Sequence, residues 1–266
     1  MVVRVCVAGA TGWAGKPLVE RLLDSKEFNL SGAVARRAAG QDIGVVLGRS
    51  PVGVSITASL KEALATPTDV LVDYTSPGSV KERVLEAVSR GVRVVIGTSG
   101  LTVSDYADIE AAATRHQVGI IAAGNFSVTA ALAKHFALFA ARYLPSWEII
   151  DYAQAGKPDA PSGTTLELAE ELARVRANWV EFPLEKTHGD VHARGASVLG
   201  TQIHSLRLPS YVISFETIFG LPDERLTIRH DAGAGAAPYV GGTMLAIQKV
   251  MTTTGLVRGL DRLLFT

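Results

Sequence analysis

The chain has 266 residues and a mass of 28.1 kDa, which is enough for one large domain or two modest ones, and we expect two. Its 26 basic and 26 acidic side chains cancel, which argues against nucleic-acid or membrane binding and favours a small-molecule partner. Cys6 is the only cysteine, and no apolar stretch approaches the roughly 20 residues of a membrane span, so we expect a soluble, unprocessed protein of a reducing cytoplasm.

The N-terminal half alternates predicted strands with predicted helices. Short runs rich in Val and Ile predict buried strands, and leucines at helical spacing, such as Leu18 and Leu22, predict helices between them. The predicted strands cover residues 2–8, 30–35, 70–73, 92–96 and 119–122, and the predicted helices cover residues 16–23, 59–65, 79–90 and 104–116. This repeating order is typical of a parallel sheet wrapped by helices, so we predict a Rossmann-like α/β domain.

The pattern changes after Asn125, where we expect a domain boundary. Helices are predicted over residues 128–143, 164–176 and 239–252, and strands over residues 147–152, 198–206, 211–219 and 224–230. The last three strands follow one another without helices between them, which predicts a second, smaller α+β domain with an open mixed or antiparallel sheet. The final helix is long enough to pack back on the first domain.

Three glycines, Gly9, Gly12 and Gly15, lie between the first predicted strand and the first predicted helix. Glycines let the backbone turn tightly and approach a pyrophosphate, while the unpaired amides of a helix start attract an anion. The spacing GxxGxxG differs from the commonest dinucleotide fingerprint but keeps its strand-turn-helix context. An ordinary turn with incidental glycines is the alternative, and the position in the first βα unit favours cofactor binding.

The second predicted strand ends at Arg36 and Arg37, where a site specific for NAD would carry an acid for the ribose hydroxyls. Two guanidinium groups suit the 2′-phosphate of NADPH, because arginine binds phosphate bidentately and stays charged. The alternative is a solvated basic loop. We therefore predict NADPH as the preferred cofactor, with NADH possible.

The loop that leads into the predicted helix at 164 combines a lysine with a helix start. Ser162, Gly163 and Thr164 lie where unpaired helix amides can receive a carboxylate, and Lys157 can supply a proton or a positive charge. A solvated loop lysine is the alternative reading of Lys157. The segment predicts a site for a small anionic substrate.

Five segments together resemble the dihydrodipicolinate reductase family, also called 4-hydroxy-tetrahydrodipicolinate reductases, which act with NAD(P)H on the diaminopimelate route to lysine. They occur in the family's order and extend over nearly the whole chain. The segments are GATGWAG from Gly9, VDYTSPGS from Val72, VVIGTSG from Val94, AAGNFSV from Ala122 and KPDAPSGT from Lys157.

The resemblance implies a role for each matching residue. Lys157 matches the family's proton donor, and the substrate carboxylate would contact Gly163 and Thr164. The implied cofactor contacts are Gly9, Ala10, Thr11, Gly12, Trp13, Ala14, Arg36, Arg37, Gly97, Thr98, Ser99, Ala123, Gly124, Asn125 and Phe126. The resemblance also implies a homotetramer, with a dinucleotide-binding domain of residues 1–126 plus 239–266 and a domain of residues 127–238 for substrate binding and oligomerisation.

One departure from the family concerns a pair of histidines that usually precedes the lysine. This chain has Ala153 and Gln154 there, and no histidine occurs between His135 and His188. Gln154 can still bond a carboxylate, whereas alanine cannot transfer a proton. Two alternatives therefore remain beside the family reaction: an imine reductase with another substrate, and a non-catalytic protein that senses dinucleotides. Reduction of an aldehyde or semialdehyde would need a nucleophile or proton relay that the sequence does not offer.

The remaining histidines are weaker candidates. His188 and His192 are four residues apart, but the glycine between them favours a surface loop, and no third metal ligand is apparent, so we predict no metal site. His230 and Asp231 end a predicted strand, and we expect a structural role for them.

Overall fold

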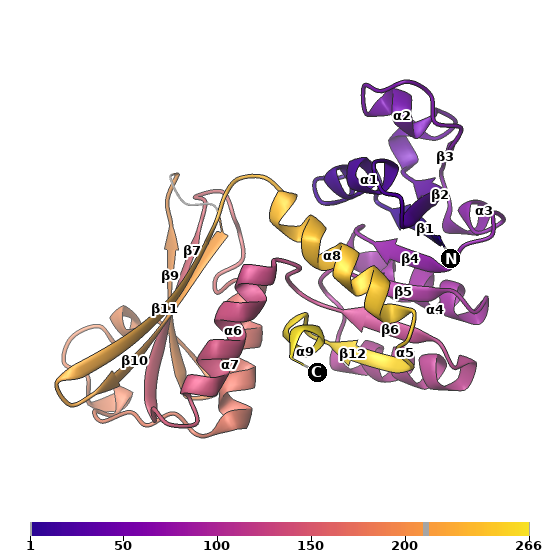
Figure 1. The fold of residues 1–266 in the computed structure, drawn as a ribbon. Coiled ribbons are helices and arrows are strands. Elements are labelled where there is room, and N and C mark those ends of the chain that lie inside the picture. The colour runs from indigo at the N-terminus through magenta and orange to yellow at the C-terminus, as the bar shows by residue number, and fades with distance from the viewer. Residues whose placement is uncertain (1, 210–212, 266) are drawn as a thin grey trace. The chain divides into compact units, whose positions relative to one another are not determined.

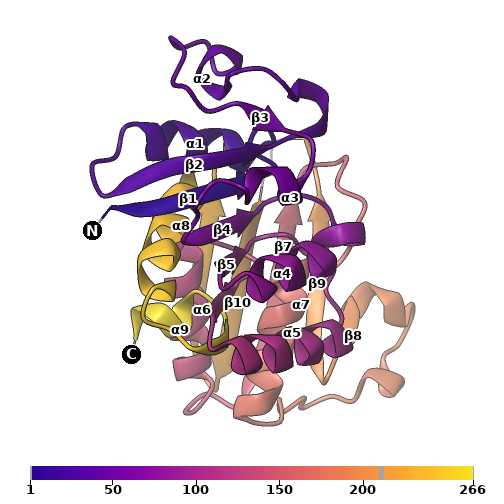
Figure 2. The same ribbon diagram turned by 90° about the vertical axis from the view of Figure 1, so that its right-hand side faces the viewer.

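The computed structural model describes residues 2–209 and 213–265, which form two compact units. One unit consists of Met1–Val128 together with Gly235–Thr266, and the other of Thr129–Ala234. Figures 1 and 2 show the elements of both units. Within the described residues, none of the helices is long and apolar enough to cross a membrane.

The first unit is built on a seven-stranded sheet in the order β12-β6-β5-β4-β1-β2-β3, with every neighbouring pair parallel. Its strands are β1 (Val3–Ala8), β2 (Phe28–Val34), β3 (Ile56–Thr57), β4 (Val70–Asp73), β5 (Arg93–Ile96), β6 (Gly119–Ala122) and β12 (Gly255–Arg258). The nearly continuous apolar runs of β1, β4, β5 and β6 are explained by burial on both faces of the sheet. The predicted Rossmann-like fold is confirmed.

Helices cover both faces of this sheet (Figures 1 and 2), with α1 and α8 on one face and α4 and α5 on the other. Leu18 of α1 and Val84 of α4 are fully buried, and burial of each such side chain stabilises the fold by about 1.5–3 kcal/mol. The helices are α1 (Gly15–Leu23), α2 (Ile43–Val46), α3 (Leu60–Ala63), α4 (Val80–Ser89), α5 (Val103–His116), α8 (Ala237–Val250) and α9 (Asp261–Leu264), with 3-10 turns η1 (Arg36–Ala38) and η2 (Pro77–Ser79).

Cys6 lies in the middle of this core. Its side chain is fully buried on β1, and burial raises the pKa of its thiol to about 12. The thiol is therefore a packing group rather than a nucleophile at neutral pH.

The second unit contains a five-stranded mixed sheet in the order β11-β10-β7-β9-β8. Its strands are β7 (Ser146–Ala153), β8 (Ala196–Val198), β9 (Thr201–Arg207), β10 (Ile213–Leu221) and β11 (Glu224–Ala232). The pair β7–β9 is parallel and the others are antiparallel, which confirms the predicted mixed sheet. Helices α6 (Val128–Ala140) and α7 (Gly163–Val175) both pack on one face of this sheet (Figure 1), and η3 (Leu184–Lys186) and η4 (Val191–Arg194) lie in the long connection that follows α7.

The core of this unit lies between the two helices and the sheet. Trp147 and Phe219 of the sheet pack with Leu168 and Leu172 of α7, and all four side chains are almost completely buried. The indole nitrogen of Trp147 donates to Thr201 Oγ1 at 3.0 Å, so its one polar group is satisfied inside the core.

The structure contains a turn where a continuous strand was predicted, and it contains short elements that were not predicted, including helices α2 and α9. The predicted strand over residues 198–206 is a hairpin, because Leu199 and Gly200 adopt positive φ angles of 47° and 84° and reverse the chain between β8 and β9. Strand β12 and the two-residue strand β3 were not predicted. The predicted strand over residues 211–219 begins outside the described residues, and its described part starts at Ile213.

Candidate functional site

The glycine-rich turn between β1 and α1 has a geometry that only glycine permits at two positions. Gly9 has a φ of 81°, and a Cβ there would lie 2.1 Å from the carbonyl oxygen of Tyr74. A Cβ on Gly15 would lie 2.1 Å from the carbonyl oxygen of Gly9. Strand, turn and helix are thus packed backbone against backbone.

Three backbone amides of this turn are available to a ligand. The amides of Thr11, Trp13 and Ala14 donate to no acceptor among the described residues, and they precede the N-terminus of α1. Free amides beside the positive end of a helix dipole are the usual grip of a protein on a pyrophosphate.

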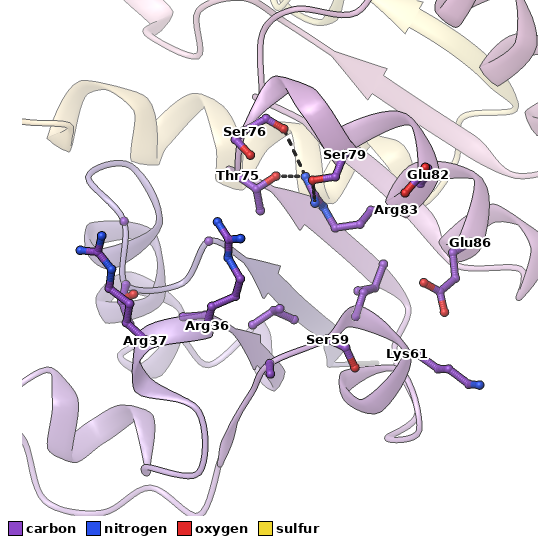
Figure 3. A pocket seen from close by; sticks show the side chains of 17 residues that line it. Arg36, Arg37, Ser59, Lys61, Thr75, Ser76, Ser79, Glu82, Arg83 and Glu86 are labelled. Atoms are coloured by element: carbon purple, nitrogen blue, oxygen red, sulfur yellow. Dashed lines mark hydrogen bonds between the residues drawn. The ribbon is translucent and has the colours of Figure 1, made fainter.

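A pocket of about 640 Å³ lies beside the glycine turn at the carboxyl ends of β1, β2 and β4 (Figure 3). Arg36 and Arg37 of η1 are exposed on its wall, and neither forms an ion pair within the described part of the chain. Their charges are therefore free to bind a phosphate group. These cations and the free amides fit the phosphates of a dinucleotide, and the site is the expected one for a Rossmann-like sheet.

Sequence reasoning missed the opposite wall of this pocket. It consists of the end of β4, the η2 turn and the first turns of α4, and Figure 3 shows Arg83 pointing toward Thr75 and Ser79. Arg83 lies four residues, or about one helical turn, after Ser79, the last residue of the VDYTSPGS segment. This spacing is the signal that could have identified it. The pocket residues outside the predicted set include Ser59, Lys61, Thr75, Ser76, Ser79, Glu82, Arg83 and Glu86.

A fully buried carboxylate organises this wall. Asp73, the last residue of β4, accepts hydrogen bonds from Arg83 Nε at 2.6 Å and from Thr98 Oγ1 at 2.6 Å. The Thr98 hydroxyl in turn accepts from the Thr75 amide at 2.8 Å. Because Asp73 balances the charge of Arg83, this arginine contributes shape and hydrogen-bond donors rather than net positive charge.

The remaining predicted cofactor residues lie along the same edge of the sheet but do not line the pocket. Residues 97–99 follow β5 and residues 123–126 follow β6. Gly97 packs against the Tyr74 ring, where a Cβ would lie 2.1 Å from a ring carbon, and Asn125 Oδ1 accepts from the Ser127 amide at 2.8 Å. Phe126 is 1% exposed, and its carbonyl oxygen packs against Gly242 of α8, so this residue offers a ligand almost no surface.

Two aromatic residues, Tyr74 and Trp13, lie beside this edge of the sheet. Tyr74 is half-buried against Phe126, and its hydroxyl shares a hydrogen bond with Thr243 Oγ1 at 2.5 Å. Partial burial raises the pKa of this hydroxyl. Trp13 is 54% exposed and meets the ring of Tyr239 edge-on at 5.4 Å. Trp13 therefore presents an indole surface beside the free amides of the turn.

The second candidate site is the loop between β7 and α7. Lys157 is 27% exposed, and its ammonium group donates to both carboxylate oxygens of Asp159. Burial acts to raise the pKa of Asp159, but the hydrogen bonds from Lys157 and from the backbone, together with the charges of Lys157 and Arg207, lower this pKa overall. Gln154 is exposed, and its carbonyl oxygen accepts from the Lys157 amide at 3.0 Å.

Only one of the three amides at residues 162–164, before and at the start of α7, is hydrogen-bonded within the described residues. The Ser162 amide donates to Asp151 Oδ2 at 2.8 Å, and the Ser162 hydroxyl lies 3.2 Å from that of Thr165, so this buried serine is engaged by the protein. The amides of Gly163 and Thr164 donate to no acceptor among the described residues. These two amides can receive a carboxylate.

The histidines do not replace the missing pair. Ala153 is buried at the end of β7, His188 and His192 are exposed in the connection after α7, and no group of three possible metal ligands occurs in residues 2–209 and 213–265. His230 lies 3.1 Å from Thr129 Oγ1 and packs on Phe215, and burial lowers the pKa of its ring.

Comparisons with known proteins all identify the same family, and the matches cover nearly the whole chain. The family profile described as dihydrodipicolinate reductase, N-terminus, matches residues 3–126, and that described as dihydrodipicolinate reductase, C-terminus, matches residues 126–264. The chain is 39% identical over 264 residues to 4-hydroxy-tetrahydrodipicolinate reductase of Desulfitobacterium hafniense and 40% identical over 263 residues to that of Moorella thermoacetica, with 98% of each chain covered. The structure of a dipicolinate-bound dihydrodipicolinate reductase from Paenisporosarcina sp. TG-14 superposes with a TM-score of 0.83 at 32% identity, covering 98% of this chain and 99% of that one.

Proposed function

Since the chain belongs to the dihydrodipicolinate reductase family, we propose that it reduces 4-hydroxy-tetrahydrodipicolinate to tetrahydrodipicolinate with a reduced nicotinamide dinucleotide, in diaminopimelate and lysine biosynthesis. The observation that carries the proposal is the loop after β7, which contains the Lys157 ammonium group and leads to the two free helix amides of Gly163 and Thr164. An acid and an anion site within one loop suit a dicarboxylate that must be protonated as it is reduced.

The first unit would bind the cofactor through the glycine turn. The amides of Thr11, Trp13 and Ala14 would hold the pyrophosphate, and residues 97–99 and 123–126 would follow the dinucleotide along the same edge of the sheet. When bound, the nicotinamide would supply a hydride from its C4 to an electron-poor carbon of the conjugated cyclic imine that remains once the 4-hydroxyl group of the substrate has left as water.

The loop after β7 would bind the substrate and supply the proton. The Gly163 and Thr164 amides would donate hydrogen bonds to one substrate carboxylate, and the Gln154 side chain would bond the same group. Lys157 Nζ would donate the proton that balances the hydride. The dipicolinate-bound relative supports a small planar dianion as the ligand, because dipicolinate is an aromatic dicarboxylate.

The preferred cofactor would be NADPH, because Arg36 and Arg37 are exposed, unpaired cations on the pocket wall. We expect the double variant Arg36→Ala/Arg37→Ala to raise the Michaelis constant for NADPH by about 10- to 100-fold and that for NADH by less than about threefold, since only NADPH carries the 2′-phosphate. Steady-state kinetics with each cofactor measure this difference. Arg115→Ala, an exposed arginine at the end of α5, is the control. Equal losses with both cofactors would refute the assignment.

The function itself is tested by NADPH oxidation in the presence of synthase-generated 4-hydroxy-tetrahydrodipicolinate. Turnover that depends on this substrate supports the proposal. Tight binding of NADPH without turnover of this or any other cyclic imine would instead identify a dinucleotide-sensing protein, and turnover of a different imine only would identify a relative with another substrate.

We further propose that residues 127–238 provide the assembly surface of a cytoplasmic homotetramer. Both α-helices of the second unit pack on one face of its sheet (Figure 1), which leaves Ile150, Tyr152, Glu216 and Arg229 together on the other face. Such a mixed apolar and polar face suits an interface between copies of one chain. Analytical ultracentrifugation would report the mass of the assembly, and a monomer at micromolar concentration would contradict this proposal.

A further inference from the structure

A buried ion pair lies beneath the loop that carries Lys157. Asp151 on β7 has a side chain that is 1% exposed, and Arg207 at the end of β9 has one that is 15% exposed. Arg207 Nη2 donates to Asp151 Oδ2 at 2.7 Å. The two strands are parallel neighbours, and Arg207 is paired with Ala153, two residues beyond Asp151 on the same face of the sheet.

The pair is attached to the loop at two points. Arg207 Nη2 also donates to the carbonyl oxygen of Asp159 at 2.6 Å, and Asp151 Oδ2 also accepts the amide of Ser162 at 2.8 Å. The first attachment lies two residues after Lys157, and the second immediately precedes the free amides of Gly163 and Thr164. One ion pair thus holds the part of the loop next to the ammonium group and the part next to the anion site.

The planar shape of the Arg207 guanidinium group lets it donate to several acceptors at once. Besides the two bonds of Nη2, its Nη1 donates to the carbonyl oxygens of Leu206 at 3.0 Å and of Asp151 at 3.3 Å. A planar fork can serve these acceptors together, whereas a lysine ammonium group on a flexible stem can reach only part of them. A third donor, Ser205 Oγ, approaches Asp151 Oδ2 at 3.1 Å and fixes the carboxylate from the neighbouring strand.

We propose that Asp151 and Arg207 are positioning residues that set the separation between Lys157 Nζ and the carboxylate-binding amides of α7. They act through the loop and not by contact with the substrate, and the inference rests on the proposed function of that loop. A misplacement of about 1 Å at a reacting centre can cost on the order of a hundredfold in rate. Ala153 and Gln154 offer no imidazole beside this loop, so Lys157 would carry the proton transfer and its position would matter for the rate.

The experiment compares Arg207→Lys with wild type and with Arg174→Lys, an exposed arginine on α7 that pairs with Glu170 at 3.8 Å. For Arg207→Lys we expect the dissociation constant of dipicolinate and the Michaelis constant of the imine to rise about tenfold, and kcat to fall about tenfold, because charge is kept but the fork is lost. The dissociation constant of NADPH should change less than twofold, since its binding residues lie in the other unit. The control should behave as wild type.

A purely structural role of Arg207 would lower the affinities for NADPH and dipicolinate together, and that result would overturn the inference. Wild-type constants in a folded Arg207→Lys protein would overturn it as well. If this variant does not fold, Ser205→Ala removes a single donor to Asp151 and should weaken dipicolinate binding two- to threefold at unchanged NADPH affinity. Unchanged dipicolinate binding in Ser205→Ala would overturn the inference.

Wild type that binds dipicolinate but does not reduce the imine would refute the proposed function alone, because the dipicolinate comparison still decides the role of Arg207. Wild type that binds no dipicolinate would overturn both.

Discussion

We expect Lys157→Met to lower kcat for the reduction of the imine by about 10²- to 10⁴-fold, the range that a positioned general acid contributes. Methionine keeps an unbranched side chain as far as Cε and removes the ammonium group that lies against Asp159. The affinity for NADPH should be unchanged, because the predicted dinucleotide contacts belong to the other compact unit. Single-turnover and steady-state kinetics separate these two quantities.

The same variant should weaken dipicolinate binding about tenfold, because a positive charge is lost beside a dianion while the Gly163 and Thr164 amides remain. Lys186→Met is the matched control, since Lys186 is an exposed lysine of η3 in the same unit. If kcat of Lys157→Met stayed within about twofold of wild type, the proton would have to come from water or another group.

Gly15→Ala should reduce the affinity for NADPH by about 10- to 100-fold and lower the free energy of unfolding by about 1–3 kcal/mol. The added Cβ would lie 2.1 Å from the Gly9 carbonyl oxygen, so the turn must open or α1 must shift. Either movement displaces the amides of Thr11, Trp13 and Ala14 from the places that a pyrophosphate requires. Isothermal titration with NADPH and denaturant unfolding measure the two effects.

Gly241→Ala provides the control for that substitution. Gly241 lies in α8 of the same unit, and a Cβ there would meet no atom within 4 Å. We expect unchanged NADPH affinity and a stability gain of up to about 1 kcal/mol, because alanine is the better helix former. Gly15→Ala with wild-type affinity would show that the turn does not bind the pyrophosphate.

The sequence alone predicted the elements whose signal is local. The strands at 70–73 and 119–122 are uninterrupted apolar runs between turns, and they occur at those residues in the structure. Strand β12 has no such signal, since the short stretch GLVR becomes a strand only by pairing with β6, which is distant in the chain. The Leu199-Gly200 turn was missed because a leucine with positive φ gives no turn signature.

The residues of the candidate sites also fall into those that the sequence could identify and those that it could not. Lys157 and the start of α7 are recognisable because a helix start and a loop lysine are adjacent in sequence. The Asp73–Arg83 and Asp151–Arg207 pairs are not, because their members are 10 and 56 residues apart and meet only through sheet register and helix packing. Ser162 lies at the helix start as the sequence predicted, but its amide donates to the buried Asp151, a contact that the sequence does not reveal.

The depth at which Cys6 lies has a practical consequence. Maleimides and peroxide react with exposed thiolates, and a thiol sealed inside β1 with a pKa of about 12 offers them neither access nor charge. Wild-type protein can therefore be handled without reductant, and one cysteine added at a chosen exposed position would be the sole target of a dye or spin label, with no background to remove.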